Sequence, residues 1–269
     1  MALPLTDSAL VGTCLAFAAL GLIAMTSGGG KAPAPAPIIV QAAPAPAAPV
    51  AIDDAFGAQV RAYLLANPEV IFEAVAEYER RNQAAQANVD QALVEAHFDA
   101  LFNDGFSWEG GNPDGDIVMV EFMDYKCGFC KRAHAEVNAF LEADGNVRFI
   151  LKEFPILGPE SELASRFAIA VHQVGGNDAY AMAHDVLMTN NDPITPELLD
   201  SISQDLGLDL AELREVMGSE GVNDILTANR NLAQMLQISG TPTFVMNTEF
   251  IRGFVPASGL AEIAATLRE

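Results

Sequence analysis

Cysteine is scarce in this chain, and its scarcity narrows what the thiols can do. Three cysteines occur among 269 residues, and Cys14 lies inside an apolar N-terminal run. Cys127 and Cys130 therefore form one close pair, which excludes the framework of several disulfides that staples small secreted domains. The pair is predicted to be redox-active or metal-binding.

Basic residues are also few. The chain has 14 Lys and Arg against 36 Asp and Glu, which gives a formal net charge of −22. Such a charge repels phosphate backbones and anionic lipid headgroups, so nucleic acid is not expected as a partner. Apolar residues make up 51% of the chain, which is enough for one good-sized core with a smaller appended module.

An uncharged apolar run over residues 9–25 indicates an export signal. Its length lies between that of a signal-peptide core and that of a full membrane span. Residues 1–26 are therefore predicted to be a signal peptide or an N-terminal membrane anchor, with residues 9–25 as the tether in the second case. Asp7 precedes the run and Lys31 follows it, which is contrary to the usual charge bias of exported chains.

Residues 27–50 turn to glycine and then to alternating alanine and proline. This composition cannot pack a core and favours extended polyproline conformations of about 3 Å per residue. The segment is predicted to be a linker. Two interpretations stay open, a spacer that holds the protein away from a membrane and a leader left after cleavage.

Residues 51–103 are predicted to form a helical arm of two helices. Asp53 or Asp54 is suited to cap the first helix, and Pro68 marks the start of the second. The second helix would run for about 34 residues, which exceeds the usual globular length. The arm either mediates self-association or folds back on its own domain, so residues 53–103 are a candidate module for a homo-oligomer.

Residues 104–269 alternate strand and helix patterns. An apolar run over 117–123 predicts a buried strand, a helix follows the cysteines, and a second strand is expected over 147–154. This strand-helix-strand unit predicts parallel pairing. Helical patterns fill about 161–237 as an insertion, and a β-hairpin with a closing helix ends the chain. The fold class is predicted to be α/β.

The C-x-x-C pair lies at the expected start of that helix, and its chemistry follows from the position. Free backbone N–H groups and the positive end of the helix dipole stabilise a thiolate at the first sulfur. Cys127 is therefore the predicted nucleophile, and Cys130, one turn inside, is the thiol that resolves a mixed disulfide. Lys126, Lys131 and Arg132 add positive charge nearby.

The competing hypothesis is a soft-metal binding protein, a copper or zinc carrier that uses the same thiols. Thiolates at this spacing bind both metals, and His134 sits one turn beyond Cys130. A structural zinc site needs four ligands, however, and the chain offers no second cysteine pair. The redox prediction is therefore preferred, and no metal ligand is assigned.

Two further features fit the redox hypothesis. Glu121 is an ionisable residue in the apolar strand, and a buried carboxylate there would have a raised pKa and exchange a proton with Cys130. The alternative places Glu121 in solvent at a sheet edge. Pro242 directly precedes a late strand, where its missing N–H would block pairing unless it serves a special geometry. A cis Thr241-Pro242 bond is the candidate.

Together these residues resemble the bacterial DsbA-like thioredoxin-fold disulfide oxidoreductases, over about residues 100–269. Particularly similar is the subgroup with an N-terminal helical extension, which includes the suppressor-of-copper-sensitivity C proteins and related disulfide isomerases. The resemblance rests on Cys127 and Cys130, on Glu121, on the helical insertion and on the Gly-Thr-Pro-Thr-Phe loop at 240–244. It implies a thioredoxin-like fold with a helical insertion, preceded by an N-terminal helical arm.

The resemblance also implies roles and partners. Cys127, Cys130 and Glu121 would be catalytic, whereas Gly128, Phe129, Thr241 and Pro242 would contact substrate, an extended segment of an unfolded or misfolded exported protein. No cofactor is expected. The protein is expected to lie in the periplasm and to have a redox partner in the inner membrane. Gly128-Phe129 replaces the Pro-His dipeptide of strongly oxidising members, so disulfide formation and isomerisation or reduction both stay open.

Overall fold

The structure is a computed structural model that describes residues 53–269. The predicted leader, tether and linker, all within residues 1–50, lie outside the described residues. Within the described part of the chain, no helix is both long enough and apolar enough to cross a membrane. Ala58–Glu269 form one compact unit, and only a few residues of the other unit, Met1–Gly57, are described.

Three helices open the described chain: α1, Asp54–Ala66, α2, Glu69–Ala96, and α3, Phe98–Phe102. The Asp53 carboxylate accepts a hydrogen bond from the Phe56 amide at 3.0 Å, which caps α1. The prediction of one continuous second helix is wrong near its end, because the backbone leaves the helical region at His97. The break accompanies the packing of Leu101 and Phe102 into a buried core, and such tertiary packing overrides helical propensity.

Five strands form one sheet in the order β1-β3-β2-β4-β5. Their bounds are β1, Trp108–Gly111, β2, Ile117–Met123, β3, Val147–Glu153, β4, Thr243–Met246, and β5, Glu249–Arg252. The predicted parallel pairing of β2 with β3 is confirmed, as is the hairpin of β4 and β5. Sequence analysis missed β1, an edge strand antiparallel to β3, because it has four residues, two of them glycine, between two turn signals.

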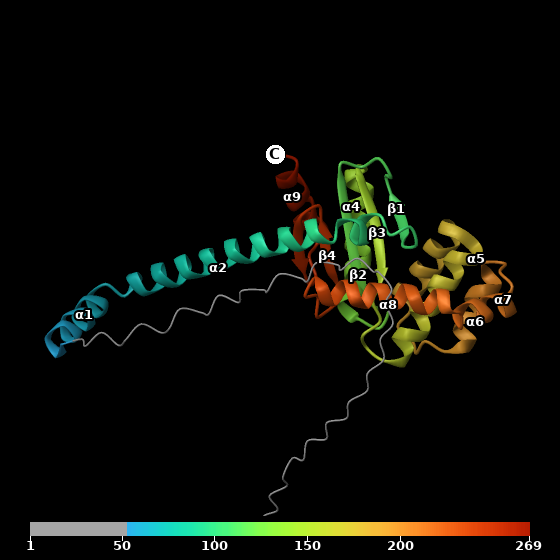
Figure 1. Cartoon of the computed structure of the whole chain (residues 1–269), viewed down its shortest axis with the longest axis horizontal. Coiled ribbons are helices and arrows are strands. Elements are labelled where there is room, and N and C mark those ends of the chain that lie inside the picture. The colour runs from blue at the N-terminus through green and yellow to red at the C-terminus, as the bar shows by residue number, and fades with distance from the viewer. Residues whose placement is uncertain (1–52) are drawn as a thin grey trace, which may run out of the picture. The chain divides into compact units, whose positions relative to one another are not determined.

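Between β3 and β4 the chain inserts four helices (Figure 1): α5, Pro159–Thr189, α6, Pro196–Asp205, α7, Leu210–Met217, and α8, Glu220–Met235. This agrees with the helical stretch predicted over about 161–237. At Gly176 the backbone of α5 leaves the helix with φ 77° and ψ −169°. Residues with a Cβ rarely adopt that φ, which explains the break expected at the glycine pair.

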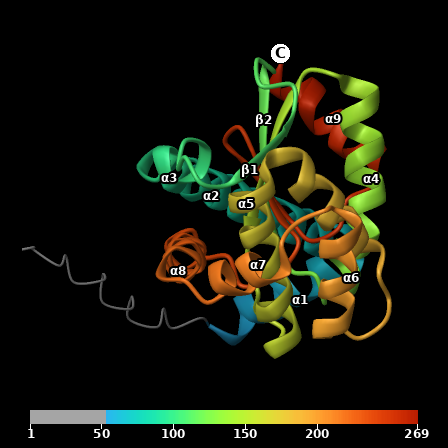
Figure 2. The ribbon, with the colours of Figure 1, turned by 90° about the vertical axis from the view of Figure 1, so that its right-hand side faces the viewer.

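Helices cover both faces of the sheet. On one face lie α4, Gly128–Asp144, and α9, Ala257–Leu267, which run side by side (Figure 2). The central strand β2 serves two cores: Met119 belongs to the core that includes residues of α4, α5 and α9, and Val120 to the core that includes residues of α2, α3 and α8. This alternation is the period of a strand buried on both sides. The architecture confirms the α/β class.

Candidate redox site

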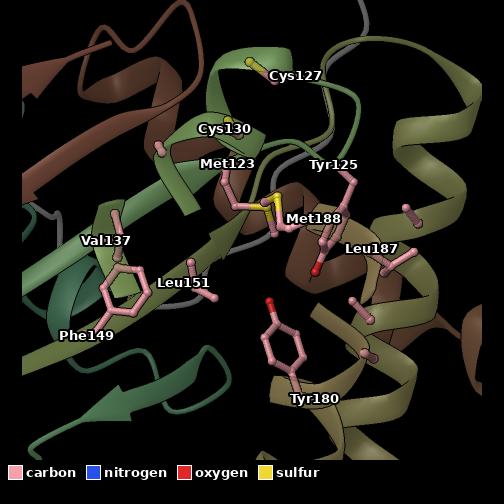
Figure 3. Packing of buried hydrophobic residues seen from close by; sticks show 14 of the residues in the cluster. Met123, Tyr125, Cys127, Cys130, Val137, Phe149, Leu151, Tyr180, Leu187 and Met188 are labelled. Carbon is pink, nitrogen blue, oxygen red and sulfur yellow. The ribbon is translucent and has the colours of Figure 1, made fainter. Parts of the chain in front are cut away.

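The two cysteines occupy the N-terminal turn of α4. Cys127 is the residue before the helix, with the extended backbone of an N-cap (φ −77°, ψ 113°), and Cys130 lies inside the first turn. Figure 3 shows Cys127 at the outer end of the helix and Cys130 deeper in the core. The first sulfur therefore lies where the free N–H groups of the helix can stabilise a thiolate. Cys127 keeps 7% of its surface exposed, whereas Cys130 is fully buried.

Hydrogen bonds lower the pKa of the Cys127 thiol from the ordinary 9.0 to about 5. The largest contribution is the hydrogen bond from the Cys130 thiol, and the Thr241 side chain and the backbone N–H groups of Cys130 and Phe129 add to it against the opposing effect of burial. Hydrogen bonds to a thiolate favour the charged form, which is why the pKa falls. At neutral pH Cys127 is therefore mostly ionised, the state that attacks disulfides.

The pKa of Cys130 moves in the opposite direction. The hydrogen bond between the two cysteines raises the pKa of Cys130 most, and burial and the nearby Glu121 carboxyl raise it further. A thiol of this kind stays protonated until a neighbouring base accepts its proton. The two thiols thus differ in their ionisation: the pKa of Cys127 is lowered and that of Cys130 is raised.

The Thr241-Pro242 loop meets Cys127 although 114 residues separate Thr241 from it in the chain. The sulfur of Cys127 lies 3.1 Å from the carbonyl oxygen of Thr241 and donates a hydrogen bond to it when protonated. The Thr241–Pro242 peptide bond is cis, and the Pro242 carbonyl accepts a hydrogen bond from the Gly253 amide at 2.9 Å. The sequence-predicted loop and cysteines are thus in contact.

Glu121 lies in the central strand β2, with 4% of its surface exposed. Burial raises its pKa to about 8, and the negative charge of Cys127 adds to the effect. A carboxyl group with that pKa is largely protonated at pH 7 and can both give and take a proton near neutrality. The structure places it inside the sheet, not in solvent at an edge; proton exchange with Cys130 stays a prediction.

Asp124 is a site residue that sequence reasoning missed. It is fully buried, and its carboxylate accepts hydrogen bonds from the amides of Lys126 at 2.8 Å, Ile156 at 2.8 Å and Leu157 at 3.0 Å. These bonds join the turn before Cys127 to the loop after β3. An aspartate that bonds the backbone two residues on is a turn signal, which the sequence did carry.

A second missed group is a buried polar cluster around Glu153. The hydroxyl groups of Tyr125 and Tyr180 approach the same Glu153 oxygen, at 2.9 and 2.6 Å, and point toward one another in Figure 3. Tyr125 also lies 3.0 Å from Nδ1 of His184. Burial raises the pKa of Glu153 to about 7. The cluster anchors Tyr125, two residues before Cys127, to both β3 and α5.

The basic residues around the cysteines have different partners. Lys126 forms an ion pair with Glu160 at 2.8 Å, and Lys131 donates to the backbone oxygen of Asn190. The guanidinium of Arg132 instead lies over the ring of Phe129, 4.4 Å from its centroid, and 5.2 Å from that of Phe254. Sequence analysis counted three charges, but only the fold shows that two of them are already engaged.

The metal hypothesis gains little from the side-chain arrangement. Across residues 53–269, no three or more His, Cys, Asp or Glu side chains gather in a way that could hold a metal ion. His134, the nearest histidine along the helix, contacts Asp185 of α5 at 2.9 Å.

Comparison with known proteins identifies two matching families. The model of the DSBA-like thioredoxin domain matches residues 118–265, more than half of the chain, and the copper resistance protein ScsC N-terminal domain matches residues 54–85. The second stretch contains no cysteine, histidine or methionine. Residues 54–85 therefore offer no soft-metal ligand, although the family is named for copper resistance.

Solved structures agree with these matches. A thioredoxin-like oxidoreductase from Silicibacter pomeroyi DSS-3 is 38% identical, with 63% of this chain and 96% of that chain covered and a TM-score of 0.59. ScsC from Proteus mirabilis, in a transitional conformation, is 26% identical, with 80% and 96% covered and a TM-score of 0.59. The share of 80% is more than residues 104–269 make up, so this match extends into residues before 104, as the predicted subgroup requires.

Curated relatives include the disulfide bond formation protein D of Bacillus subtilis, which is 27% identical over 164 residues, 56% of this chain and 72% of that protein. A Na(+)/H(+) antiporter NhaA of Salinispora tropica is 27% identical over 139 residues, but the chain spans only 21% of its length. The predicted thioredoxin-like fold, and a family whose members include disulfide oxidoreductases, are confirmed. With these matches and this site, the chain belongs to the family of DSBA-like thioredoxin domain proteins.

Proposed function

We propose that this protein catalyses thiol:disulfide exchange in exported proteins of the bacterial periplasm through Cys127 and Cys130. The observation that carries the proposal is the opposite shift of the two pKa values, to about 5 at Cys127 and upward at Cys130. A similar structure from Salmonella enterica is described as a periplasmic thioredoxin-like protein, and the apolar run at residues 9–25 supports export.

In the oxidising direction, a substrate thiolate attacks the Cys127 sulfur of the Cys127–Cys130 disulfide. The bond between the two cysteines breaks, its electron pair leaves on Cys130, and that sulfur takes a proton. A second substrate thiolate then attacks the substrate sulfur of the mixed disulfide, and Cys127 leaves as its stabilised thiolate. Two electrons pass from the substrate to the protein.

In the reducing direction, the Cys127 thiolate attacks one sulfur of a substrate disulfide, whose S–S bond breaks with the electron pair leaving on the other substrate sulfur. Cys130 then loses its proton and attacks the Cys127 sulfur, which releases the second substrate thiolate and forms the Cys127–Cys130 disulfide. In isomerisation, a different substrate thiolate attacks the substrate sulfur of the mixed disulfide instead, and Cys127 leaves again as a thiolate with no net redox change. Glu121 is proposed to exchange the Cys130 proton in both the oxidising and the reducing direction, because its pKa of about 8 allows either protonation state near neutral pH.

Glu121→Gln is therefore expected to slow the resolution of mixed disulfides about a hundredfold or more, the usual contribution of a positioned acid or base. Glutamine has the shape of glutamate but cannot titrate. In the wild type, the fraction of Glu121 that can accept a proton rises with pH through about 8, so resolution should accelerate over that range. The mixed disulfide between Cys127 and a small aromatic thiol is formed, and its decay is followed by rapid acid quenching. This measures the resolution rate of the wild type and of the variant across the pH range.

Glu142→Gln is the matched control, because Glu142 is an exposed acid on α4, the helix that carries Cys130. It should resolve mixed disulfides as the wild type does. If Glu121→Gln keeps both the wild-type rate and its acceleration toward pH 8, Glu121 is not the group that exchanges the proton.

The substrate is proposed to be an extended segment of an unfolded or misfolded protein. Gly128 and Phe129 are exposed beside the nucleophile, and Thr241-Pro242 lies across it, within 3.1 Å of the sulfur at the Thr241 carbonyl. Backbone groups at such a loop can bind a peptide strand. A redox partner in the inner membrane is proposed to reset the cysteines after each turnover.

Activity on protein substrates tests the proposal directly. The purified full chain should accelerate the formation or rearrangement of disulfides in a reduced or scrambled secreted protein, with the glutathione redox buffer setting the direction. No acceleration in oxidising or reducing buffer would refute it. Stoichiometric copper or zinc bound at better than micromolar affinity, without exchange, would favour the metal carrier instead.

Self-association through residues 53–103 is also proposed, with these residues as an arm and residues 104–269 as the catalytic domain. The arm exposes large apolar side chains, each between 42% and 66% exposed: Phe56, Val60, Tyr63, Ile71, Val75 and Tyr78. In α2 they follow the alternating spacing of four and three residues that marks a coiled-coil seam. A second copy of the chain would cover them, and the match of residues 54–85 to an ScsC N-terminal domain supports a specialised role.

Val75→Glu is expected to lower the mass in solution to that of a single chain, because it places a charge in the proposed seam. Ala84→Glu is the control: Ala84 is also exposed on α2 but faces away from the seam. Light scattering measures both. A wild-type chain that is already monomeric, and far more oxidising than glutaredoxins, would rule out an isomerase assembled through the arm and favour a monomeric oxidase.

A further inference from the structure

Arg132 is unusual among the basic residues of this acidic protein. Most Lys and Arg side chains within residues 53–269 form an ion pair with a carboxylate; the exceptions are Arg61, Lys131 and Arg132. Lys131 is engaged by a backbone oxygen, and Arg61 lies on α1. Arg132 is thus the cation beside the cysteines that has neither a carboxylate nor a backbone-oxygen partner in the described chain.

The local structure explains why Arg132 has no carboxylate partner. Glu136, one turn further along α4, is the residue best spaced to pair with it. A carboxylate oxygen of Glu136 instead accepts a hydrogen bond from the amide of Ala257 at 2.8 Å, at the start of α9. The exposed guanidinium of Arg132 is left over the rings of Phe129 and Phe254.

This arrangement keeps the guanidinium ready to bind. A guanidinium that lies over an aromatic ring keeps its N–H groups, which point outward in its own plane, and those groups match the two oxygens of a carboxylate. Phe129 lies between the two cysteines in the chain, and helical side chains lean toward the N-terminus, so Arg132 extends toward the end of α4 at which Cys127 lies. Phe129 and Phe254, 54% and 37% exposed, add an apolar rim.

We propose that Arg132 selects substrates by binding a carboxylate close in sequence to the cysteine that reacts with Cys127. The preferred segments would carry Asp or Glu within about three residues of that cysteine, since an extended chain rises about 3.3 Å per residue, with an apolar residue against the two phenyl rings. The inference rests on the proposed exchange function and names the substrate class of that same site.

Paired peptides test this preference. Each pair is identical except for Glu or Gln at one position near a single cysteine, and the position is scanned on both sides. The rate constant with which each reduced peptide opens the Cys127–Cys130 disulfide of the full chain is measured, and the Glu-to-Gln ratio is compared between protein variants. Intrinsic peptide reactivity cancels in that comparison, as does any effect of the variant on Cys127 itself.

At the best position, Arg132→Gln is expected to lower the Glu-to-Gln ratio about threefold, the size of an exposed ion pair. Arg132→Glu should reverse the preference, and Arg132→Lys should retain part of it. Arg214→Gln removes the same charge from α7 and should behave as the wild type. Equal ratios in the wild type and Arg132→Gln at every position overturn the inference, whereas no exchange with any peptide overturns the proposed function.

Discussion

Cys127→Ser is expected to abolish thiol:disulfide exchange and leave only the uncatalysed rate. Serine cannot form the thiolate, and the second cysteine cannot replace it. Cys130 is fully buried, and its hydrogen bond to Cys127, its burial and Glu121 all raise its pKa. The variant loses the hydrogen bond to Cys127, but burial and Glu121 still keep the Cys130 thiol protonated, and a buried, protonated thiol is a poor nucleophile. Reduction of a protein disulfide in a glutathione buffer measures the loss.

Cys130→Ser is the matched control. It retains the helix position of Cys127, so the first attack should still occur, but no thiol remains to resolve the product. Mixed disulfides with substrate should accumulate and be visible on non-reducing gels. Both variants are made with Cys14→Ser, so that no third thiol contributes. Catalysis that survives in Cys127→Ser would show that another group starts the reaction.

The predicted site residues could be recognised from the sequence because their signals are local. A C-x-x-C pair at a helix start, an acid in an apolar strand and a proline before a strand each depend on a few neighbouring residues. The structure brings Cys127 into contact with Thr241 and buries Glu121. The chemical roles of these residues stay predictions.

The residues that support the site could not be predicted from the sequence, because their contacts join parts of the chain that are far apart. Glu153 bonds to Tyr180, 27 residues away, and Asp124 to Leu157, 33 residues away. Which polar side chains meet in a core depends on the register of β2 with β3 and on where α5 crosses them. Composition shows that three cations surround the cysteines, but only tertiary structure shows that Arg132 is the one without a polar partner in the described part of the protein.

The low pKa of Cys127 has a large expected effect on the reduction potential. The thiolate exists only in the reduced protein, so its stabilisation favours the reduced form. A pKa of about 5 in place of 9.0 favours that form by about 2.7 kcal/mol at pH 7, since each of the two pH units above 5 adds about 1.36 kcal/mol. This is roughly a hundredfold in the equilibrium constant, or about 60 mV more oxidising than an unshifted pair.

The sign of the effect sets its pH dependence. A depressed pKa stabilises the reduced form fully above the ordinary pKa of 9.0, and this stabilisation is lost as the pH falls through about 5. The advantage over an unshifted pair should therefore shrink from pH 7 toward pH 5 and vanish below it. Equilibration with glutathione across this range, with the two redox forms separated after acid quenching, measures it.

Thr241→Val tests the cause of this potential. The variant removes the side-chain hydrogen bond that helps to lower the pKa of Cys127, so the pKa should rise by about one unit and the potential at pH 7 should fall by about 30 mV. Thr241→Ser keeps the hydroxyl group and should stay near the wild type. If the ultraviolet absorbance of the thiolate titrates near 9 in the wild type, the expected oxidising shift disappears. A low pKa unchanged in Thr241→Val would instead assign the stabilisation to Cys130 and the helix amides.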